Sequence, residues 1–174
     1  MKRAIIGVLI VVLALWLVGC QSVSEKIGEE IGEEIAGGVV GGDVEVDGDS
    51  VTVETDDGAV TVENGEAGEL PDGFPDDFPV YDGATVDSAS SIAADGDTTF
   101  YVNLVSKDAV ADVYDWYKEE FGSSGWEIKS DVMMSGDGQD SAMLSVEKGS
   151  MTGTLSVVVG SGGTDIGIIL VIEG

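Results

Sequence analysis

Histidine is absent from the 174 residues, and cysteine occurs once, as Cys20. Histidine is the usual general base near neutral pH and the commonest side-chain ligand of metals, so its absence removes Ser-His and Cys-His nucleophile pairs and most catalytic metal centres. The segment Gly160–Gly163 lacks the lysine and the following helix of a phosphate-binding loop. Carboxylates are numerous, yet no pair stands out as the acid and base of a hydrolase. The sequence therefore predicts no enzyme, no catalytic residue, no metal ligand and no cofactor.

Basic residues and disulfide partners are also scarce. The chain has 7 Lys and Arg against 34 Asp and Glu, a formal net charge of −27. This charge repels phosphate backbones, so nucleic acid is excluded as a partner, and it repels acidic lipid headgroups as well. Two interpretations stay open: the charge attracts cations or a basic partner, or it keeps the protein soluble, for example in a salty habitat. Since a single cysteine cannot form an internal disulfide, core packing alone must hold the fold.

An apolar run of 15 residues, 4–18, follows the basic pair Lys2-Arg3. A bilayer-spanning helix needs about 20 residues, whereas this length is typical of a signal-peptide core. The run ends in Leu17-Val18-Gly19-Cys20, which resembles the lipobox of bacterial lipoproteins. The resemblance implies that a diacylglyceryl group is attached to the Cys20 thiol and that cleavage makes Cys20 the first residue of an exported, membrane-anchored chain. Two other interpretations are a membrane-spanning helix that continues past Val18, and a buried or reactive free thiol.

Changes in residue pattern divide the chain into five expected parts. They are a signal peptide (1–19), a lipidated tether (20–42), a β-meander (43–69), a Pro-aromatic connector (70–83) and an α+β domain (84–174). In the tether, Ile27, Ile31 and Ile35 recur every four residues opposite glutamates, which predicts a short amphipathic helix over 24–36. That helix would be a stalk or partner helix, or else a flexible spacer with residual helicity.

The expected meander consists of valines that alternate with polar residues, separated by Asp-Gly turns. We expect its valine face to dock on the larger domain or on a partner, because three small strands are marginal alone. Asp43, Glu45, Asp47 and Glu54 nearly reproduce the spacing of an EF-hand calcium loop. However, β-branched residues lead up to the last of these acids, where an EF-hand loop leads into a helix. This favours a hairpin turn over a calcium site.

The connector holds all three prolines, at positions 71, 75 and 79, with Phe74, Phe78 and Tyr81 between them. This spacing forbids helix and strand and predicts an extended, stiff segment. Such a segment can be a ligand for a groove in a partner, although packing of its rings onto the following domain is the favoured interpretation.

The pattern after residue 84 predicts the order ββαββββ, a twisted antiparallel sheet with one packed helix. We expect the helix to run from a cap at Ser106 to Phe121, with Trp116 outside its inward stripe, either in a binding patch or packed along the flank of the sheet. Apolar residues on both faces of 166–172 predict a central last strand. The expected stripe is Val110, Val113, Tyr114, Tyr117 and Phe121, and Trp126, Ile128, Val132 and Met134 are expected to share one face of the next strand.

Several short motifs resemble those of a group of uncharacterised bacterial lipoproteins. These are Leu70-Pro71, Asp77-Phe78-Pro79, the segment 114–118 and Gly125-Trp126. The resemblance implies an anchored chain with a short β-segment, a connector and a C-terminal α+β domain, and it implies no reaction. We expect a non-enzymatic binding or scaffolding module in the cell envelope, partnered by the membrane through its lipid and by an envelope protein. The alternative is a calcium- or cation-binding surface lipoprotein, and the oligomeric state stays open.

Overall fold

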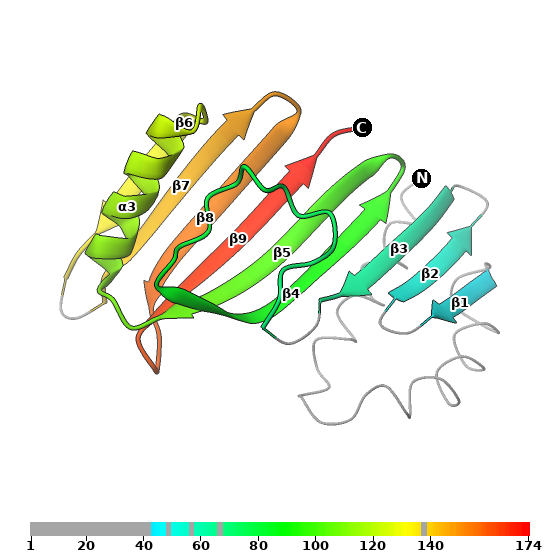
Figure 1. Ribbon diagram of the computed structural model, residues 1–174, viewed down its shortest axis with the longest axis horizontal. Coiled ribbons are helices and arrows are strands. Elements are labelled where there is room, and N and C mark those ends of the chain that lie inside the picture. Colours follow the sequence, from blue (N-terminus) through cyan, green and yellow to red (C-terminus); the bar gives the residue numbers. More distant parts are fainter. Residues whose placement is uncertain (1–42, 48–49, 56–57, 66–67, 137–138) are drawn as a thin grey trace. The chain divides into compact units, whose positions relative to one another are not determined.

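The computed structural model describes residues 43–47, 50–55, 58–65, 68–136 and 139–174 (Figure 1). The lipobox with Cys20 and the expected helix over 24–36 lie outside these residues. The chain divides into two compact units, 1–62 and 63–174, which are described separately. Within the described residues, no helix combines the length and apolar character that crossing a bilayer requires.

The described residues of the first unit form three strands in the order β1-β2-β3. These are β1 (Asp43–Asp47), β2 (Ser50–Thr55) and β3 (Gly58–Asn64), and the last residues of β3 pass into the second unit. β1 and β2 are antiparallel, with Asp43 opposite Glu54. The hydroxyl groups of Thr52 and Thr61 lie 3.1 Å apart. The segment with EF-hand-like spacing is therefore a β-hairpin, because its β-branched residues extend a strand where a calcium loop would lead into a helix.

The second unit is built on an antiparallel sheet of six strands in the order β4-β5-β9-β8-β7-β6 (Figure 1). The central place of β9, between β5 and β8, is the position predicted from its apolar residues. Together with α3 (Val110–Ser123), the single helix among the described residues, this sheet confirms an α+β class with one packed helix. The strands are β4 (Ala84–Ala94), β5 (Asp97–Ser106), β6 (Glu127–Met134), β7 (Ser141–Lys148), β8 (Met151–Val159) and β9 (Thr164–Ile172).

The start of α3 differs from the prediction. Its N-cap is Ala109, which makes no side-chain capping bond. Ser106 instead ends β5, where its buried hydroxyl accepts a hydrogen bond from the Asp108 backbone N–H at 3.1 Å. The Asp108 carbonyl in turn accepts one from the Thr164 hydroxyl at 2.7 Å. Ser106 is thus used in the turn between β5 and α3, and the helix begins one turn later than its cap preference suggests.

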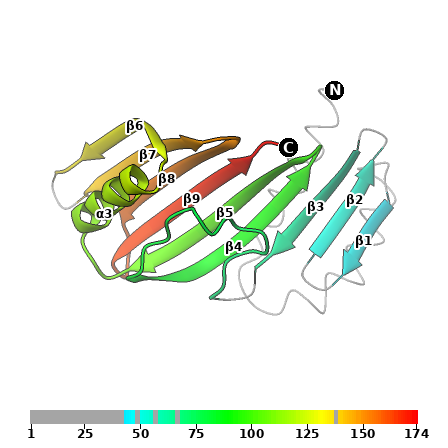
Figure 2. The same ribbon diagram turned by 45° about the horizontal axis from the view of Figure 1, so that its top comes forward.

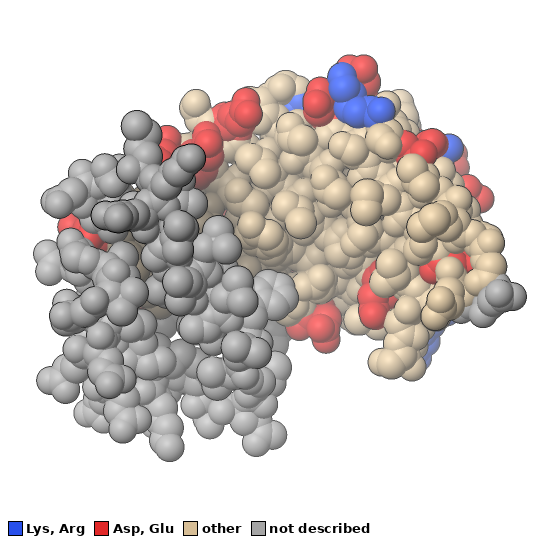
Figure 3. Space-filling model, turned by 180° about the vertical axis from the view of Figure 1, so that it is seen from behind, with Lys and Arg blue, Asp and Glu red and all other residues tan. Residues whose placement is uncertain are grey.

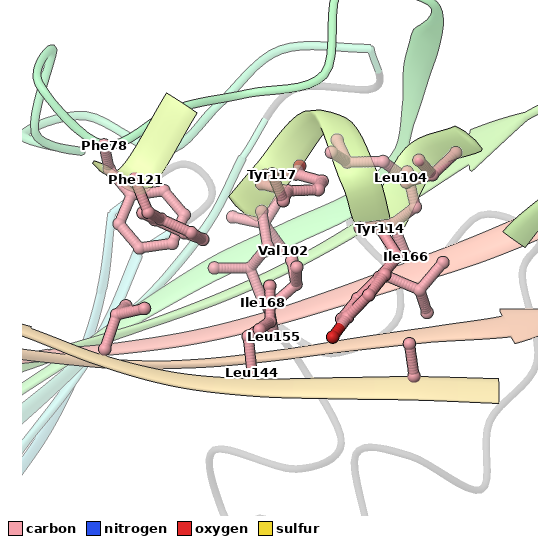
Figure 4. Close-up of a cluster of buried hydrophobic side chains, with 14 of the residues drawn as sticks. Phe78, Val102, Leu104, Tyr114, Tyr117, Phe121, Leu144, Leu155, Ile166 and Ile168 are labelled. Atoms are coloured by element: carbon pink, nitrogen blue, oxygen red, sulfur yellow. The ribbon is translucent and has the colours of Figure 1, made fainter. Parts of the chain in front are cut away.

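The inward stripe of α3 is confirmed, since all five predicted residues are buried. Tyr117 and Phe121 are 0% exposed and point toward the sheet. Tyr117 lies above Val102, Leu155 and Ile168, and Phe121 lies beside Phe78 (Figure 4). The helix lies over β6, β7 and β8, and the connector crosses the same face of the sheet beside it (Figure 2). Packed side chains therefore fill the space between α3 and the sheet.

The predicted face of β6 is wrong beyond its first residues. Trp126, just before the strand, is 4% exposed, which confirms it as a core residue. The register then shifts between Ile128 and Ser130, as in a β-bulge, and this reverses the alternation. Val132 and Met134 are consequently 49% and 64% exposed.

The bulge also turns a charged residue toward the helix side. Asp131 pairs in register with the fully buried Leu144. There it forms an ion pair with Lys118 of α3 at 2.6 Å, and it accepts a hydrogen bond from the Tyr114 hydroxyl at 3.3 Å. The hydrogen bond from Lys118, followed by its charge, lowers the pKa of the Asp131 carboxyl. An extra residue in β6 therefore provides a polar contact between strand and helix.

Candidate functional site: a pocket between the connector and the helix

The connector makes consecutive tight turns. The Phe74 N–H donates to the Pro71 carbonyl, and the Phe78 N–H donates to the Pro75 carbonyl, each at 3.1 Å. Gly73 has a φ of 76°, which suits the third position of a type II turn. The connector is neither helix nor strand, as predicted, but the expectation of an extended segment is wrong. The turn-forming pairs Asp72-Gly73 and Asp76-Asp77, which stand between proline and phenylalanine, allow the chain to turn instead.

The connector rings pack onto the second unit, as the favoured interpretation predicted. Phe78 is 3% exposed, and its ring lies edge-to-face with Phe74, Phe121 and Trp126 at centroid distances of 5.7, 5.4 and 5.2 Å. Beneath it lies Gly153 of β8, where an added Cβ would lie only 3.0 Å from the Phe78 ring. A glycine in this buried strand therefore provides the space that the ring occupies.

Polar contacts hold the same segment in place. The Trp126 indole N–H donates to the Asp77 carbonyl at 3.1 Å, and the Asp77 carboxylate forms an ion pair with Lys148 at 2.7 Å. The Tyr81 backbone N–H donates to the Tyr117 hydroxyl at 3.3 Å, which gives this buried phenol a partner inside the core. Burial raises the pKa of Tyr117 well above its usual range. The connector is thus fixed by both rings and hydrogen bonds.

The other end of the connector is fixed by Tyr81. Its hydroxyl donates to the Asp108 carboxylate at 2.8 Å. This hydrogen bond, followed by burial and the charges of Asp108 and Asp112, raises the pKa of Tyr81 to about 12. The phenol therefore stays neutral and hydrogen-bonded throughout the physiological pH range.

Trp116 lies against the connector. Its half-buried ring meets Tyr81 edge-on at 5.1 Å and the Tyr117 ring at 4.9 Å. The ring therefore packs against the core, in line with the favoured expectation, but onto the connector and a neighbouring ring of α3 rather than along the sheet. Trp116 also lines the pocket described next, which is where the interpretation of this residue as part of a binding patch applies.

A pocket opens beside Trp116, between the connector and α3. Its volume is about 410 Å³, within the range of about 300–1,000 Å³ usual for small-ligand pockets. Rings and prolines form its walls, and three carboxylates line it, while no lysine or arginine does. The combination suits a positively charged group that carries an apolar body. The lining residues are Leu70, Phe74, Pro75, Asp76, Phe78, Pro79, Val80, Asp82, Trp116 and Glu120.

Sequence reasoning singled out the aromatic residues of this pocket but not its carboxylates. Asp76, Asp82 and Glu120 are three among 34 acidic residues, so nothing in the sequence distinguishes them. The aspartates in the turns between the prolines were the available sequence signal for such carboxylates. When Phe78 packs into the core, its neighbour Asp76 is left at the surface. In the described ranges, the pocket included, no group of three or more acidic or cysteine side chains is placed to hold a metal ion.

Comparison with known proteins gives one finding. A family model described as START domain-like matches residues 86–164, less than half of the chain. The match runs from β4 to the first residue of β9 and includes Trp116 and Glu120, whereas the connector lies outside it. No curated protein and no solved structure matches the chain. The second unit is thus similar to START domain-like proteins over most of its sheet and its helix.

Proposed function

We propose that this protein is a lipid-anchored, extracytoplasmic, non-enzymatic binding module whose pocket receives a basic, partly apolar side chain of an envelope partner. The observation that carries this proposal is the chemistry of the pocket: aromatic and proline walls with Asp76, Asp82 and Glu120 and no basic residue. The similarity to START domain-like proteins favours a ligand-binding fold. The lipobox at Cys20 supports the anchored location.

The electrostatics of the chain favour a cation. A formal net charge of −27 draws basic partners toward the protein, and the carboxylates of the pocket concentrate that attraction locally. The face of the Trp116 ring adds a cation–π contact of about 0.5–1 kcal/mol at a partly exposed site. Each exposed charge pair adds about 0–1 kcal/mol and weakens with salt. The pocket therefore suits moderate, salt-sensitive binding rather than a tight cofactor site.

The anchor and the acidic surface complement each other in this proposal. The charge keeps the protein from adsorbing to acidic headgroups, so the lipid alone holds it at the bilayer. Each buried methylene contributes about 0.8 kcal/mol, and two or three acyl chains hold firmly. Growing cells with a clickable fatty acid should label the wild-type protein and leave Cys20→Ala unlabelled. Label retained on Cys20→Ala would remove the anchor from the proposal.

Calorimetry with a short acetylated peptide amide of alternating leucine and arginine tests the pocket. Glu120→Gln should weaken binding by about two- to fivefold, the loss expected for one exposed charge pair. Glu119→Gln is the matched control, because it removes the same charge from the next residue of α3, outside the pocket lining. Equal affinities for the two variants would mean that the peptide senses only the overall charge, and the pocket proposal would fail. A peptide with glutamate in place of arginine should not bind.

A further inference from the structure

Tyr81 stands at the end of the pocket wall without lining the pocket itself. The connector residues on either side of it, Val80 and Asp82, both line the pocket, and so does Trp116 of α3. The Tyr81 ring lies edge-to-face with the Trp116 ring, at a centroid distance of 5.1 Å and an interplanar angle of 90°. Tyr81 is therefore part of the chain segment that forms one wall and is packed against the residue that forms the other.

The hydroxyl of Tyr81 holds the ring in this position. It donates to the Asp108 carboxylate at 2.8 Å, across 27 positions of sequence. The backbone of Asp108 is itself held, because its N–H donates to the Ser106 hydroxyl at 3.1 Å and its carbonyl accepts from the Thr164 hydroxyl at 2.7 Å. The Tyr81 ring is thus tied to the turn between β5 and α3 and, through that turn, to the start of β9.

Gly83 leaves the space that this hydrogen bond requires. A Cβ added at position 83 would lie 2.7 Å from the Tyr81 ring and 2.9 Å from the Asp108 carboxylate. The Tyr81 carbonyl also accepts a hydrogen bond from the Ala84 N–H at 3.0 Å, which closes a tight turn. The turn and its glycine therefore allow the ring and the carboxylate to meet.

We propose that Tyr81 is a positioning residue of the pocket: its hydroxyl bond to Asp108 holds the Trp116 ring and the end of the connector in the arrangement that receives a basic, partly apolar side chain. This inference rests on the proposed function and names the residue that prepares the site for its ligand. A side chain that is already held loses little conformational freedom on binding, so the affinity is higher than for a mobile one. Tyr81 acts through Trp116 and the connector, since its own hydroxyl is turned to Asp108 and its side chain lies outside the pocket lining.

Tyr81→Phe removes the hydroxyl and keeps the ring, so it isolates the bond to Asp108. In calorimetry with the leucine–arginine peptide, this variant should bind about two- to tenfold more weakly, the loss expected when binding must immobilise a side chain that the wild type already holds. Tyr101→Phe is the matched control and should bind like the wild type. Tyr101 alternates with the buried Phe100 and Val102 along β5, so it lies on the sheet face away from α3. Figure 3 shows that face, where uncharged residues occupy the middle of the described surface and do not attract a basic peptide.

An Asp108→Ala background separates positioning from direct contact with the peptide. This substitution removes the acceptor and one charge, so it weakens binding by itself, while both backbone hydrogen bonds of residue 108 can remain. Adding Tyr81→Phe should then cause no further loss of affinity, because the bond is already absent. An equal loss in both backgrounds would mean that the Tyr81 hydroxyl contacts the peptide, and the inference would fail. Thermal unfolding establishes that each variant is folded.

A measurement without peptide distinguishes failure of this inference from failure of the proposed function. Nuclear magnetic relaxation of the indole N–H groups should report a more mobile Trp116 ring in Tyr81→Phe than in wild type, while Trp126, held by the Asp77 carbonyl, stays unchanged. If the wild type does not bind the peptide, the proposed function fails, and the relaxation result alone decides whether Tyr81 holds the ring. Unchanged mobility of Trp116, or unchanged affinity of Tyr81→Phe in a wild type that binds, would overturn the inference.

Discussion

Replacing Phe78 by alanine probes whether the connector is part of the core of the second unit. The ring is 3% exposed and contacts three other aromatic rings, so little water reaches it in the folded state. Truncation of a buried phenylalanine to alanine costs about 3–5 kcal/mol, from lost transfer energy and the cavity left behind. We expect the upper part of this range, because the rigid rings of Phe121 and Trp126 cannot collapse into the space.

The expected shift in melting temperature follows from the size of the unit. An unfolding entropy of about 2.1 cal/mol/K per residue over roughly 110 residues gives about 0.23 kcal/mol/K, so a loss of about 4 kcal/mol lowers Tm by about 17 °C. Thermal unfolding of the full-length chain, followed by near-ultraviolet circular dichroism, measures the shift. Phe74→Ala is the control, because this half-buried ring of the pocket wall should cost about half as much. A loss below about 1 kcal/mol for Phe78→Ala would refute the packing of the connector into the core.

Three further substitutions test individual contacts. Gly153→Ala should destabilise the protein by about 1–3 kcal/mol in urea unfolding, because its methyl group would lie 2.9 Å from the Val146 side chain and 3.0 Å from the Phe78 ring. A neutral result would contradict the close packing around Gly153. Asp108→Asn should move the Tyr81 titration, followed by phenolate absorbance, from about pH 12 toward the ordinary value near 10. Because folding raises this pKa, the stabilisation from the Tyr81–Asp108 hydrogen bond is fully present below about pH 10 and is lost toward pH 12. The free energies of unfolding of the variant and the wild type should therefore differ less at high pH. Asp131→Asn should lower Tm slightly at neutral pH. The difference in Tm between variant and wild type should vanish as pH falls through the lowered pKa of Asp131, because protonation breaks the pair with Lys118 in wild type as well. A difference that stays constant with pH would exclude the ion pair as its cause.

Residue periodicity was sufficient to predict much of the second unit. The inward stripe of α3 follows from spacings of three and four, and each of its five residues is buried. The apolar residues on both faces of β9 indicated a central strand, and the strand lies between β5 and β8. Burial of apolar side chains provides most of the stabilisation in both cases, and such burial leaves a periodic trace in the sequence.

Other features leave no such trace. Ser106 has the chemistry of a helix cap, but tertiary hydrogen bonds around Asp108 place it in a turn instead. The bulge in β6 depends on pairing with β7, so alternation alone predicted the wrong face for Val132 and Met134. The pocket depends on the packing of a turn-rich connector over Gly153, a contact between segments about 75 residues apart in sequence.

The most direct test of the proposed binding module is a nuclear magnetic resonance titration that follows the tryptophan indole signals. Trp116 lines the pocket, whereas the Trp126 indole N–H is held by the Asp77 carbonyl inside the core and is an internal control. With the leucine–arginine peptide, the Trp116 signal should shift in a saturable manner while the Trp126 signal stays in place. A Trp116 signal that stays unchanged, or equal shifts of both indoles, would contradict the account.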